Sequence, residues 1–260
     1  MTLLRSEWIK LTSTKSAYWL YGLAIVLGVG LAALIGQFEQ AATGTTATNG
    51  EVAVDAPGGG SDPLFALIGV GAFTLFLSWI GAIVAVTGEY RFHTLKATFL
   101  AVPKRWPVIA VKTALLAVLS AAVTAVSVIL ALLVAGALSG NESWTPFSGD
   151  GLTFLWRLTV QAALGTVAVI GLAYIMRNAA GTISLFLVWT LALEGLVGLI
   201  PRIGDSLAGW LPFANADYWV QGDFAKGSIT WGPGTALLWF AVVCVALWAI
   251  GLVLTLRRDA

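Results

Sequence analysis

The sequence has very little charge for its length. Only 10% of its 260 residues are charged, whereas 58% are hydrophobic. Soluble domains carry about 25% charged and about 45–50% apolar residues. A water-soluble fold of this length could not bury so much apolar surface, so the composition predicts an integral membrane protein.

Residues that build metal and redox sites are scarce. The chain has one cysteine, Cys244, and one histidine, His93. A lone cysteine excludes an intramolecular disulfide, and these two residues make a zinc site improbable. The nucleotide-binding pattern GxxxxGK[ST] is absent, and no His/Asp/Glu or Ser/Lys group has a spacing suited to intramembrane catalysis. We therefore expect no catalytic residues, no metal, no cofactor held by this chain and no nucleic-acid partner.

Six apolar runs are long enough to cross a hydrocarbon core of about 30 Å. They are residues 17–35, 64–86, 108–138, 158–176, 182–200 and 235–256. Each is expected to be a helix, because an unpaired backbone group in lipid costs several kcal/mol. The first run spans about 28 Å at helical rise, which indicates a retained span rather than a signal peptide. The sequence thus predicts an all-α integral membrane protein with one transmembrane domain over residues 1–260.

The cations between the runs predict the orientation. With the N-terminus inside, 11 of the 14 lysines and arginines fall on the cytoplasmic side. They are Arg5, Lys10, Lys15, Arg91, Lys96, Lys104, Arg105, Lys112, Arg177, Arg257 and Arg258, against Arg157, Arg202 and Lys226 outside. Because inner loops carry the excess of positive charge, we expect both termini in the cytoplasm.

The outer segment 201–233 differs from an ordinary loop. Its sequence, PRIGDSLAGWLPFANADYWVQGDFAKGSITWGP, mixes proline and glycine breaks with tryptophan, leucine and phenylalanine. It is too apolar for a solvated loop and too interrupted for a span. The pattern favours a short re-entrant or interface-lying segment on the outer side.

The loop 88–107, GEYRFHTLKATFLAVPKRWP, is the longest predicted cytoplasmic connection. Residues 94–102 favour a short helix that Pro103 stops. One interpretation is that Lys104, Arg105 and Lys112 only fix topology and attract anionic headgroups, at about 1 kcal/mol each. That reading explains these three cations well, but it leaves Glu89 and the helix unexplained. A charged helix in the cytoplasm is better suited to docking another protein.

Residues 2–15, TLLRSEWIKLTSTK, form a second candidate for contact at the inner face. Leu4, Trp8 and Leu11 recur at helical spacing, with Arg5 and Lys10 off the apolar stripe. This pattern predicts an amphipathic helix along the inner interface. A generic membrane anchor and a docking element explain it equally well.

These two segments resemble the permease subunits of type-2 ATP-binding-cassette (ABC) exporters. The similarity rests on RSEWIKLTSTKSAYW, on GEYRFHTLKATFLAVPKRW, and on the span count and loop lengths of the whole chain. In that family the loop after span two reads E-x-R-x-G-T, followed by a proline and basic residues. Glu89, Arg91, Thr94 and Pro103 match this pattern, whereas His93 stands at the usual glycine.

The resemblance implies a partner and a location. The loop would be a coupling helix seated on a separate ABC ATPase, which binds the ATP, and Glu7, Trp8 and Lys10 would lie in an elbow helix beside it. The expected ATPase contacts are Glu89, Arg91, His93, Thr94, Lys96, Phe99, Pro103, Lys104 and Arg105. A second permease copy, or a related permease, would complete the path in the bacterial cytoplasmic membrane. The apolar spans favour an amphipathic or lipid-like cargo.

Two polar residues inside the spans are candidates for a substrate path. A carboxylate at the bilayer centre costs about 2.5–3.5 kcal/mol, so Glu194 in the fifth span needs a reason to be there. It could line a path or gate, or it could be a structural partner for Arg202 or a hydroxyl, or a protonated acid. Gln161 in the fourth span is a weaker candidate of the same kind. A proton-coupled secondary transporter that uses Glu194 is the alternative to an ABC permease.

Overall fold

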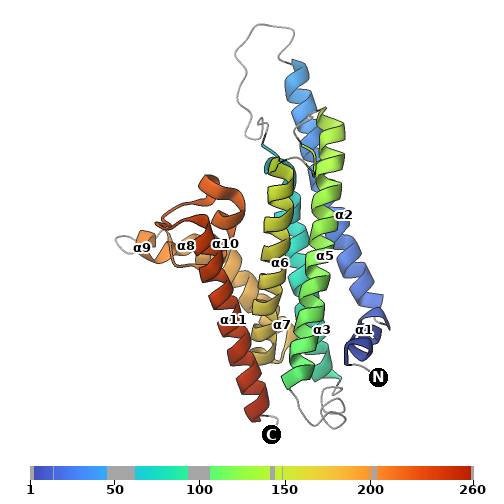
Figure 1. Cartoon of the computed structure of the whole chain (residues 1–260), viewed down its shortest axis with the longest axis vertical. Helices are drawn as coiled ribbons and strands as arrows, with labels where there is room; N and C mark the ends of the chain where they lie inside the picture. The colour runs from blue at the N-terminus through green and yellow to red at the C-terminus, as the bar shows by residue number, and fades with distance from the viewer. Residues whose placement is uncertain are drawn as a thin grey trace. The chain divides into compact units, whose positions relative to one another are not determined.

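The structure, a computed structural model, describes residues 3–13, 15–45, 62–92, 106–140, 144–147, 149–198, 200 and 204–258. Every regular element in these residues is helical (Figure 1). The α-helices are α1 (Leu3–Ser13), α2 (Lys15–Thr45), α3 (Phe76–Arg91), α5 (Trp106–Ser139), α6 (Gly149–Met176), α7 (Ala179–Leu187), α8 (Glu194–Val197), α9 (Gly204–Ala208), α10 (Pro212–Gln221) and α11 (Pro233–Arg258). The shorter helices are η1 (Phe65–Leu67) and η4 (Gly222–Ala225), which are 3₁₀, and η2 (Val70–Leu75) and η3 (Val188–Leu193), which are π-helical.

The six predicted spans are confirmed as helices long and apolar enough to cross a membrane. They cover Tyr18–Ala41, Phe65–Arg91, Trp106–Ser139, Gly149–Met176, Ala179–Val197 and Pro233–Arg257. The prediction of an all-helical, multi-pass membrane protein therefore holds. The inside position of both termini and the placement of α1 at the membrane interface stay predictions.

Some helices extend beyond the ends of the apolar runs, because polar residues continue them. The fourth helix begins at Gly149 rather than at 158. Its first turn holds Asp150, and the Thr153 hydroxyl donates to the Gly149 carbonyl at 2.7 Å, so polar residues that hydropathy assigns to a loop continue the helix. The fifth span is not one regular helix: α7 runs into the π-helical η3, and α8 follows with Glu194 as its first residue. A π-turn leaves no mark in hydropathy, so the sequence could not reveal it.

The outer segment predicted for residues 201–233 is broken, as its prolines and glycines indicated. Its described part contains the one-turn helix α9, the ten-residue helix α10 and the 3₁₀ turn η4. Gly222 and Gly227 have φ angles of +63° and +47°, a backbone region that favours glycine. Insertion of this segment into the membrane stays a prediction.

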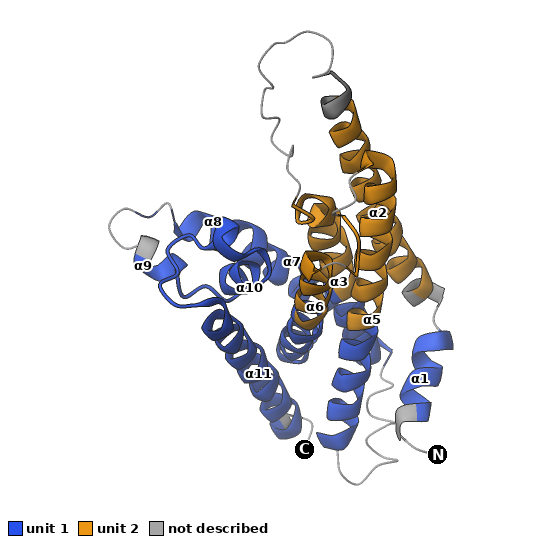
Figure 2. Ribbon diagram, turned by 45° about the horizontal axis from the view of Figure 1, so that its top comes forward, with its two compact units in different colours: residues 1–17, 79–119, 161–260 blue, residues 18–78, 120–160 orange. Residues whose placement is uncertain are grey.

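The chain divides into two compact units (Figure 2). Unit 2 comprises residues 18–78 and 120–160, and unit 1 comprises residues 1–17, 79–119 and 161–260. In unit 2, the backbones of α2 and of the next span meet at Gly28 and Gly69, where a Cβ on Gly69 would lie 2.5 Å from the Gly28 carbonyl oxygen. The hydroxyl of Thr74 donates a hydrogen bond to the Ala24 carbonyl beside this contact. Small residues allow such close approach of spans.

Unit 1 holds the residues that bear on function. In its interior, the fully buried Trp79 donates from its indole Nε1 to the carbonyl of Ala162 at 3.0 Å. The ring of Trp79 lies over Gly165, where a Cβ would approach the indole to 2.3 Å. The helices α6 and α11 also approach closely, since a Cβ on Gly171 would lie 2.6 Å from the Leu247 carbonyl.

Candidate functional site

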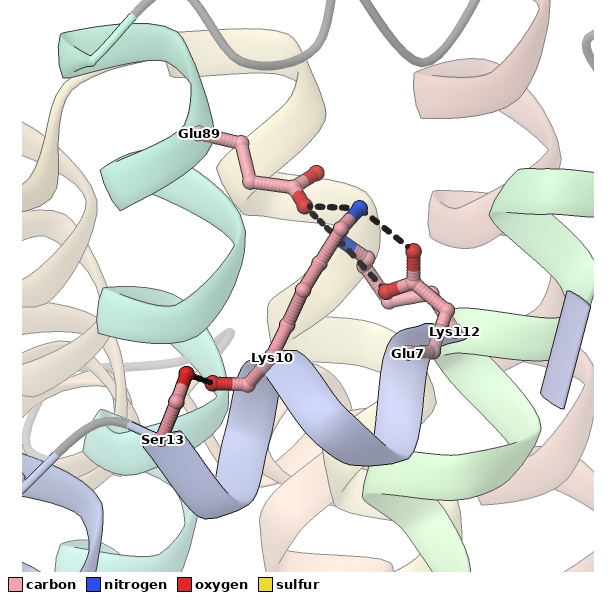
Figure 3. Close-up of polar contacts among 5 residues, drawn as sticks. All are labelled: Glu7, Lys10, Ser13, Glu89 and Lys112. Atoms are coloured by element: carbon pink, nitrogen blue, oxygen red, sulfur yellow. Dashed lines mark hydrogen bonds and ion pairs between the residues drawn. The ribbon is translucent and has the colours of Figure 1, made fainter. Parts of the chain in front are cut away.

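Four charged residues of unit 1 form one ion-pair network (Figure 3). Glu7 and Lys10 come from α1, Glu89 from the end of α3 and Lys112 from the second turn of α5. Lys10 Nζ lies 2.7 Å from Glu7 Oε1 and 3.1 Å from Glu89 Oε1. Lys112 Nζ lies 3.0 Å from Glu7 Oε2 and also pairs with Glu89. Each lysine thus bridges both carboxylates, and the formal charges cancel.

The network is largely removed from water. The exposed fractions of Glu7, Glu89 and Lys112 are 3%, 9% and 5%, and only Lys10 is partly open. Charges buried to this degree are tolerated when they are paired and hydrogen-bonded. The four residues therefore depend on one another, and they hold α1, α3 and α5 in one arrangement.

The pKa values of Glu7 and Lys10, both in α1, reflect this pairing. Burial raises the pKa of Glu7, but the charge of Lys112 and the hydrogen bonds from both lysines outweigh it, so the pKa lies below its ordinary value. Burial lowers the pKa of Lys10, but its bonds and attraction to Glu7 and Glu89 outweigh that and raise it. Both groups are therefore held in their charged forms around neutral pH.

The network brackets the charged loop. Glu89 lies just before residues 93–105, and Lys112 lies one to two turns after them. The predicted contacts His93, Thr94, Lys96, Phe99, Pro103, Lys104 and Arg105 lie outside the described residues. At the described edge of the loop, Arg91 is exposed, with its guanidinium 5.5 Å from the centre of the Phe92 ring.

Helix α1 buries a charged residue and exposes apolar ones. The predicted helix over residues 2–15 is found as α1, and Trp8 and Ile9 are 51% and 48% exposed while Glu7 faces the interior of unit 1. Of the apolar stripe identified in the sequence, Trp8 is exposed and Leu11 is half-buried. The sequence did not show the buried side, because Glu7 reads as solvent-facing without Glu89 and Lys112 beside it.

Tyr90 and Arg177 extend the contacts of the loop stem. Sequence reasoning counted Arg177 only among the cytoplasmic cations and assigned Tyr90 no role. The guanidinium of Arg177 lies 5.2 Å from the centre of the Tyr90 ring, and the Tyr90 hydroxyl is 3.4 Å from Thr255 Oγ1. Arg177 has a φ of +55°, which is uncommon for a residue other than glycine. Adjacent residues at the end of α3 therefore face different helices: Glu89 pairs with α1 and α5, and Tyr90 contacts the end of α6 and α11.

Glu194 occupies a second polar site, at the start of α8. One of its carboxylate oxygens accepts hydrogen bonds from the Trp189 indole at 3.0 Å and from the Phe213 backbone amide at 3.1 Å. The other accepts from the backbone amide of Ala214 at 2.7 Å. The sequence alternatives named Arg202, a hydroxyl or a protonated acid. Arg202 lies outside the described residues. Among the described residues, Glu194 accepts from one indole and from two backbone amides of α10.

Gln161 also binds α10. Its side-chain Nε2 donates to Asp217 Oδ1 at 3.2 Å, and Gln161 itself is buried. Both polar residues that the sequence located inside spans thus contact the same ten-residue helix. Their place in a substrate path stays a prediction.

Comparisons of the chain with protein-family models, with curated proteins and with solved structures find no match.

Proposed function

We propose that the chain is the membrane-spanning permease subunit of an ATP-driven ABC exporter, powered by a separate ATPase that docks on the loop 88–107. The observation that supports this most directly is the network of Glu7, Lys10, Glu89 and Lys112 around the stem of that loop. The motif Glu89–Arg91–Thr94–Pro103 in the sequence supports it independently.

A loop that receives force needs a stiff attachment to the spans. In the described part of the chain, Lys112 joins the two stems of the loop through Glu89, and Glu7 and Lys10 fasten α1 to both. Because moving one member would leave a buried charge without its partner, a displacement of the loop is costly unless the helices move together. Such a stem suits the transmission of ATP-driven motion better than a flexible topology anchor would.

The proposal assigns the chemistry to the partner. The ATPase binds and hydrolyses ATP, and this chain contributes the path for an amphipathic or lipid-like molecule in the bacterial cytoplasmic membrane. A second copy of the chain or a related permease completes the path. No residue of this chain is catalytic in the proposal.

A proton-coupled carrier that uses Glu194 is the weaker alternative. Both oxygens of its carboxylate accept hydrogen bonds from the chain itself, which leaves the group less available to a substrate. The two proposals differ in energy source: a carrier would continue to transport under a proton gradient after ATP is depleted, and the permease would stop.

Co-purification tests the docking. The tagged chain is expressed in turn with each ABC ATPase subunit that its own genome encodes and is isolated in mild detergent. We expect a stable complex, and we expect Arg91→Glu to weaken it because Arg91 is exposed at the described edge of the loop. Arg91 is a better probe than Glu89, whose replacement would disturb the buried ion pairs as well.

Lys226→Glu provides the matched control. Lys226 is equally exposed but lies in the outer segment, so reversing its charge is expected to leave the complex intact. Failure of the unmodified chain to retain the ATPase, or equal loss of complex in the two variants, would contradict the proposal.

A further inference from the structure

Helix α10 lacks a cap of its own. Its N-cap residue is Leu211, whose side chain makes no capping hydrogen bond. The amides of Phe213 and Ala214 are at the second and third helical positions, the ones that an N-cap side chain normally satisfies. Glu194 satisfies both from another helix. By contrast, α7 is capped locally, because Asn178 accepts from the Gly181 amide at 3.1 Å.

The π-turn of the fifth span helps to orient the Glu194 carboxylate. Trp189 and Glu194 are five residues apart, a spacing that an α-helix with 3.6 residues per turn places about 140° apart around the axis. The i→i+5 bonds of a π-turn bring such residues close to one above the other. The turn η3 therefore lets the Trp189 indole donate to Glu194. The carboxylate is oriented within its own span while it binds α10.

Further contacts hold the same helix. The ring of Phe213 lies 5.7 Å from Trp79, 5.9 Å from Phe186 and 5.6 Å from Phe240, measured between ring centres. Asp217 accepts the amide of Gln161. Further along, Ala216 packs with Ala168, Phe240 and Cys244. The first turns of α10 thus sit among side chains of four spanning helices, held at one end by Glu194.

The other end of α10 leads into a connection that can bend. Gly222 ends the helix with a φ of +63°, η4 follows, and Gly227 has a φ of +47°. Hinges are short segments of this kind that absorb changes in backbone angles. The arrangement is a short helix tied by side chains at its start and by glycine-dependent turns at its end.

We propose that Glu194 is a positioning residue that latches α10 onto the fifth span, and that the outer segment 204–227 swings as a flap when this latch opens. The movement would open the path outward, and in that respect the inference rests on the proposed function. Glu194 acts here through α10 and not by binding cargo.

The native Cys244 reports the state of the latch. Its side chain is 1% exposed and lies in one buried cluster with Ala216 of α10, so lifting α10 would make it more reactive. The test measures the rate at which N-ethylmaleimide labels Cys244 in the isolated full chain in lipid nanodiscs. We expect Glu194→Gln to raise this rate about tenfold, because an amide keeps one acceptor oxygen for three N–H donors and leaves a buried donor without an acceptor. Asp150→Asn, an equivalent change at an exposed residue outside the segment 204–227, is expected to leave the rate unchanged.

A second substitution separates a latch from a mere cap. Leu211 has the extended backbone of an N-cap, with φ −69° and ψ 129°, so Leu211→Asp can cap α10 locally. In the double variant L211D/E194Q we expect the hydrogen-exchange rate of the α10 amides to return to that of the unmodified chain. The labelling of Cys244 by N-ethylmaleimide is expected to stay fast. If the exchange rate and the labelling rate both return to those of the unmodified chain, Glu194 is only a cap and the proposal is overturned.

Gln161→Leu covers the case in which E194Q does not fold. It removes a second polar tie to α10 without touching the fifth span, and we expect it to speed Cys244 labelling severalfold. Unchanged labelling in whichever of these variants folds refutes the latch. The labelling test contains no ATPase, so unchanged labelling would refute the latch and leave the permease proposal intact. Failure to bind the ATPase in the co-purification test would refute the permease proposal and leave the latch intact.

Discussion

At the scale of single residues, the charges inside this protein are explained by their partners. Glu7 and Glu89 are two acids in an apolar chain, and either one alone would be costly to bury. Lys112, on the second turn of a long apolar helix, pairs with both. A buried network of this kind adds little net stability over apolar packing, but removing one member is expensive. Its value lies in fixing which helices adjoin.

Replacing Glu7 by glutamine tests this dependence and its pH range. At pH 7 we expect Glu7→Gln to lower the free energy of unfolding by about 1–3 kcal/mol, because Lys112 and Lys10 lose a charged acceptor. The folded pKa of Glu7 is lowered, so its contribution is complete above the ordinary value of 4.5 and is lost as the pH falls through the folded pKa. The raised pKa of Lys10 means that its contribution persists below 10.5 and is lost as the pH rises through the folded value.

Thermal unfolding of the detergent-solubilised chain between pH 3 and pH 7 measures the effect. The difference between the unmodified chain and E7Q is expected to be constant above about pH 5 and to shrink below it. Asp223→Asn serves as the control, since this exposed acid lies in η4, away from the network. A difference that stays the same down to pH 3 would show that the charge of Glu7 is not what stabilises the fold.

At the scale of helices, glycines set how closely the spans of unit 1 approach. The helices α6 and α11 meet backbone to backbone, since a Cβ on Gly251 would lie 2.5 Å from the Gly171 carbonyl oxygen. Backbone atoms cannot move aside as a flexible side chain can. The pair therefore depends on the absence of side chains at two positions.

Gly171→Ala is expected to destabilise the protein by about 1–3 kcal/mol, the usual cost of overpacking. The added Cβ would meet the Leu247 carbonyl at 2.6 Å. Gly30→Ala in α2 is the matched control, because a Cβ there meets nothing within 4 Å, and it should be neutral or stabilising by up to about 1 kcal/mol. Unfolding curves of both variants in the same detergent decide the matter, and equal stabilities would refute the close contact.

The helices themselves were predictable, and their interruptions were not. Apolar runs of spanning length identify all six spans, because hydropathy depends on composition alone. The π-turn before Glu194 and the extension of the fourth helix to Gly149 depend on backbone hydrogen bonds and polar residues, which hydropathy does not register. The breaks of the outer segment were visible because proline and glycine act locally.

At the scale of the whole molecule, the direction of the chain in the membrane is predicted from its cations and can be measured directly. In a chain carrying Cys244→Ala, single cysteines replace Thr12, Lys226 or Arg257, all exposed. With both termini inside, an impermeant maleimide added to sealed right-side-out vesicles is expected to label K226C, and to label T12C and R257C only after permeabilisation.

Labelling of T12C in sealed vesicles would place the N-terminus outside. The loop 88–107 would then face away from any cytoplasmic ATPase, and the proposed function would fail with the topology. The unmodified C244A chain controls for reaction at residues other than cysteine.

The candidate sites were only half visible in the sequence. Glu194 and Gln161 were named from their chemistry, because a carboxylate or an amide inside an apolar span is costly. Glu7, Lys10 and Glu89 were named through the resemblance to ABC permeases. Their partners could not be named, since Lys112 reaches Glu7 and Trp189 reaches Glu194 only through helix packing and a π-turn. Sequence reasoning therefore finds which residues matter sooner than it finds what they touch.

The four-residue network also constrains how the protein is made. Glu7 and Glu89 leave the ribosome before Lys112, so the lysine that neutralises them deep in the fold arrives last. Until then α1 and the first two hydrophobic segments hold both acids of the network but only one of its two lysines, Lys10, so closing the network would bury one acid without its full set of partners. Biosynthesis should hold these segments beside the insertion machinery and release them to lipid only once the third has emerged.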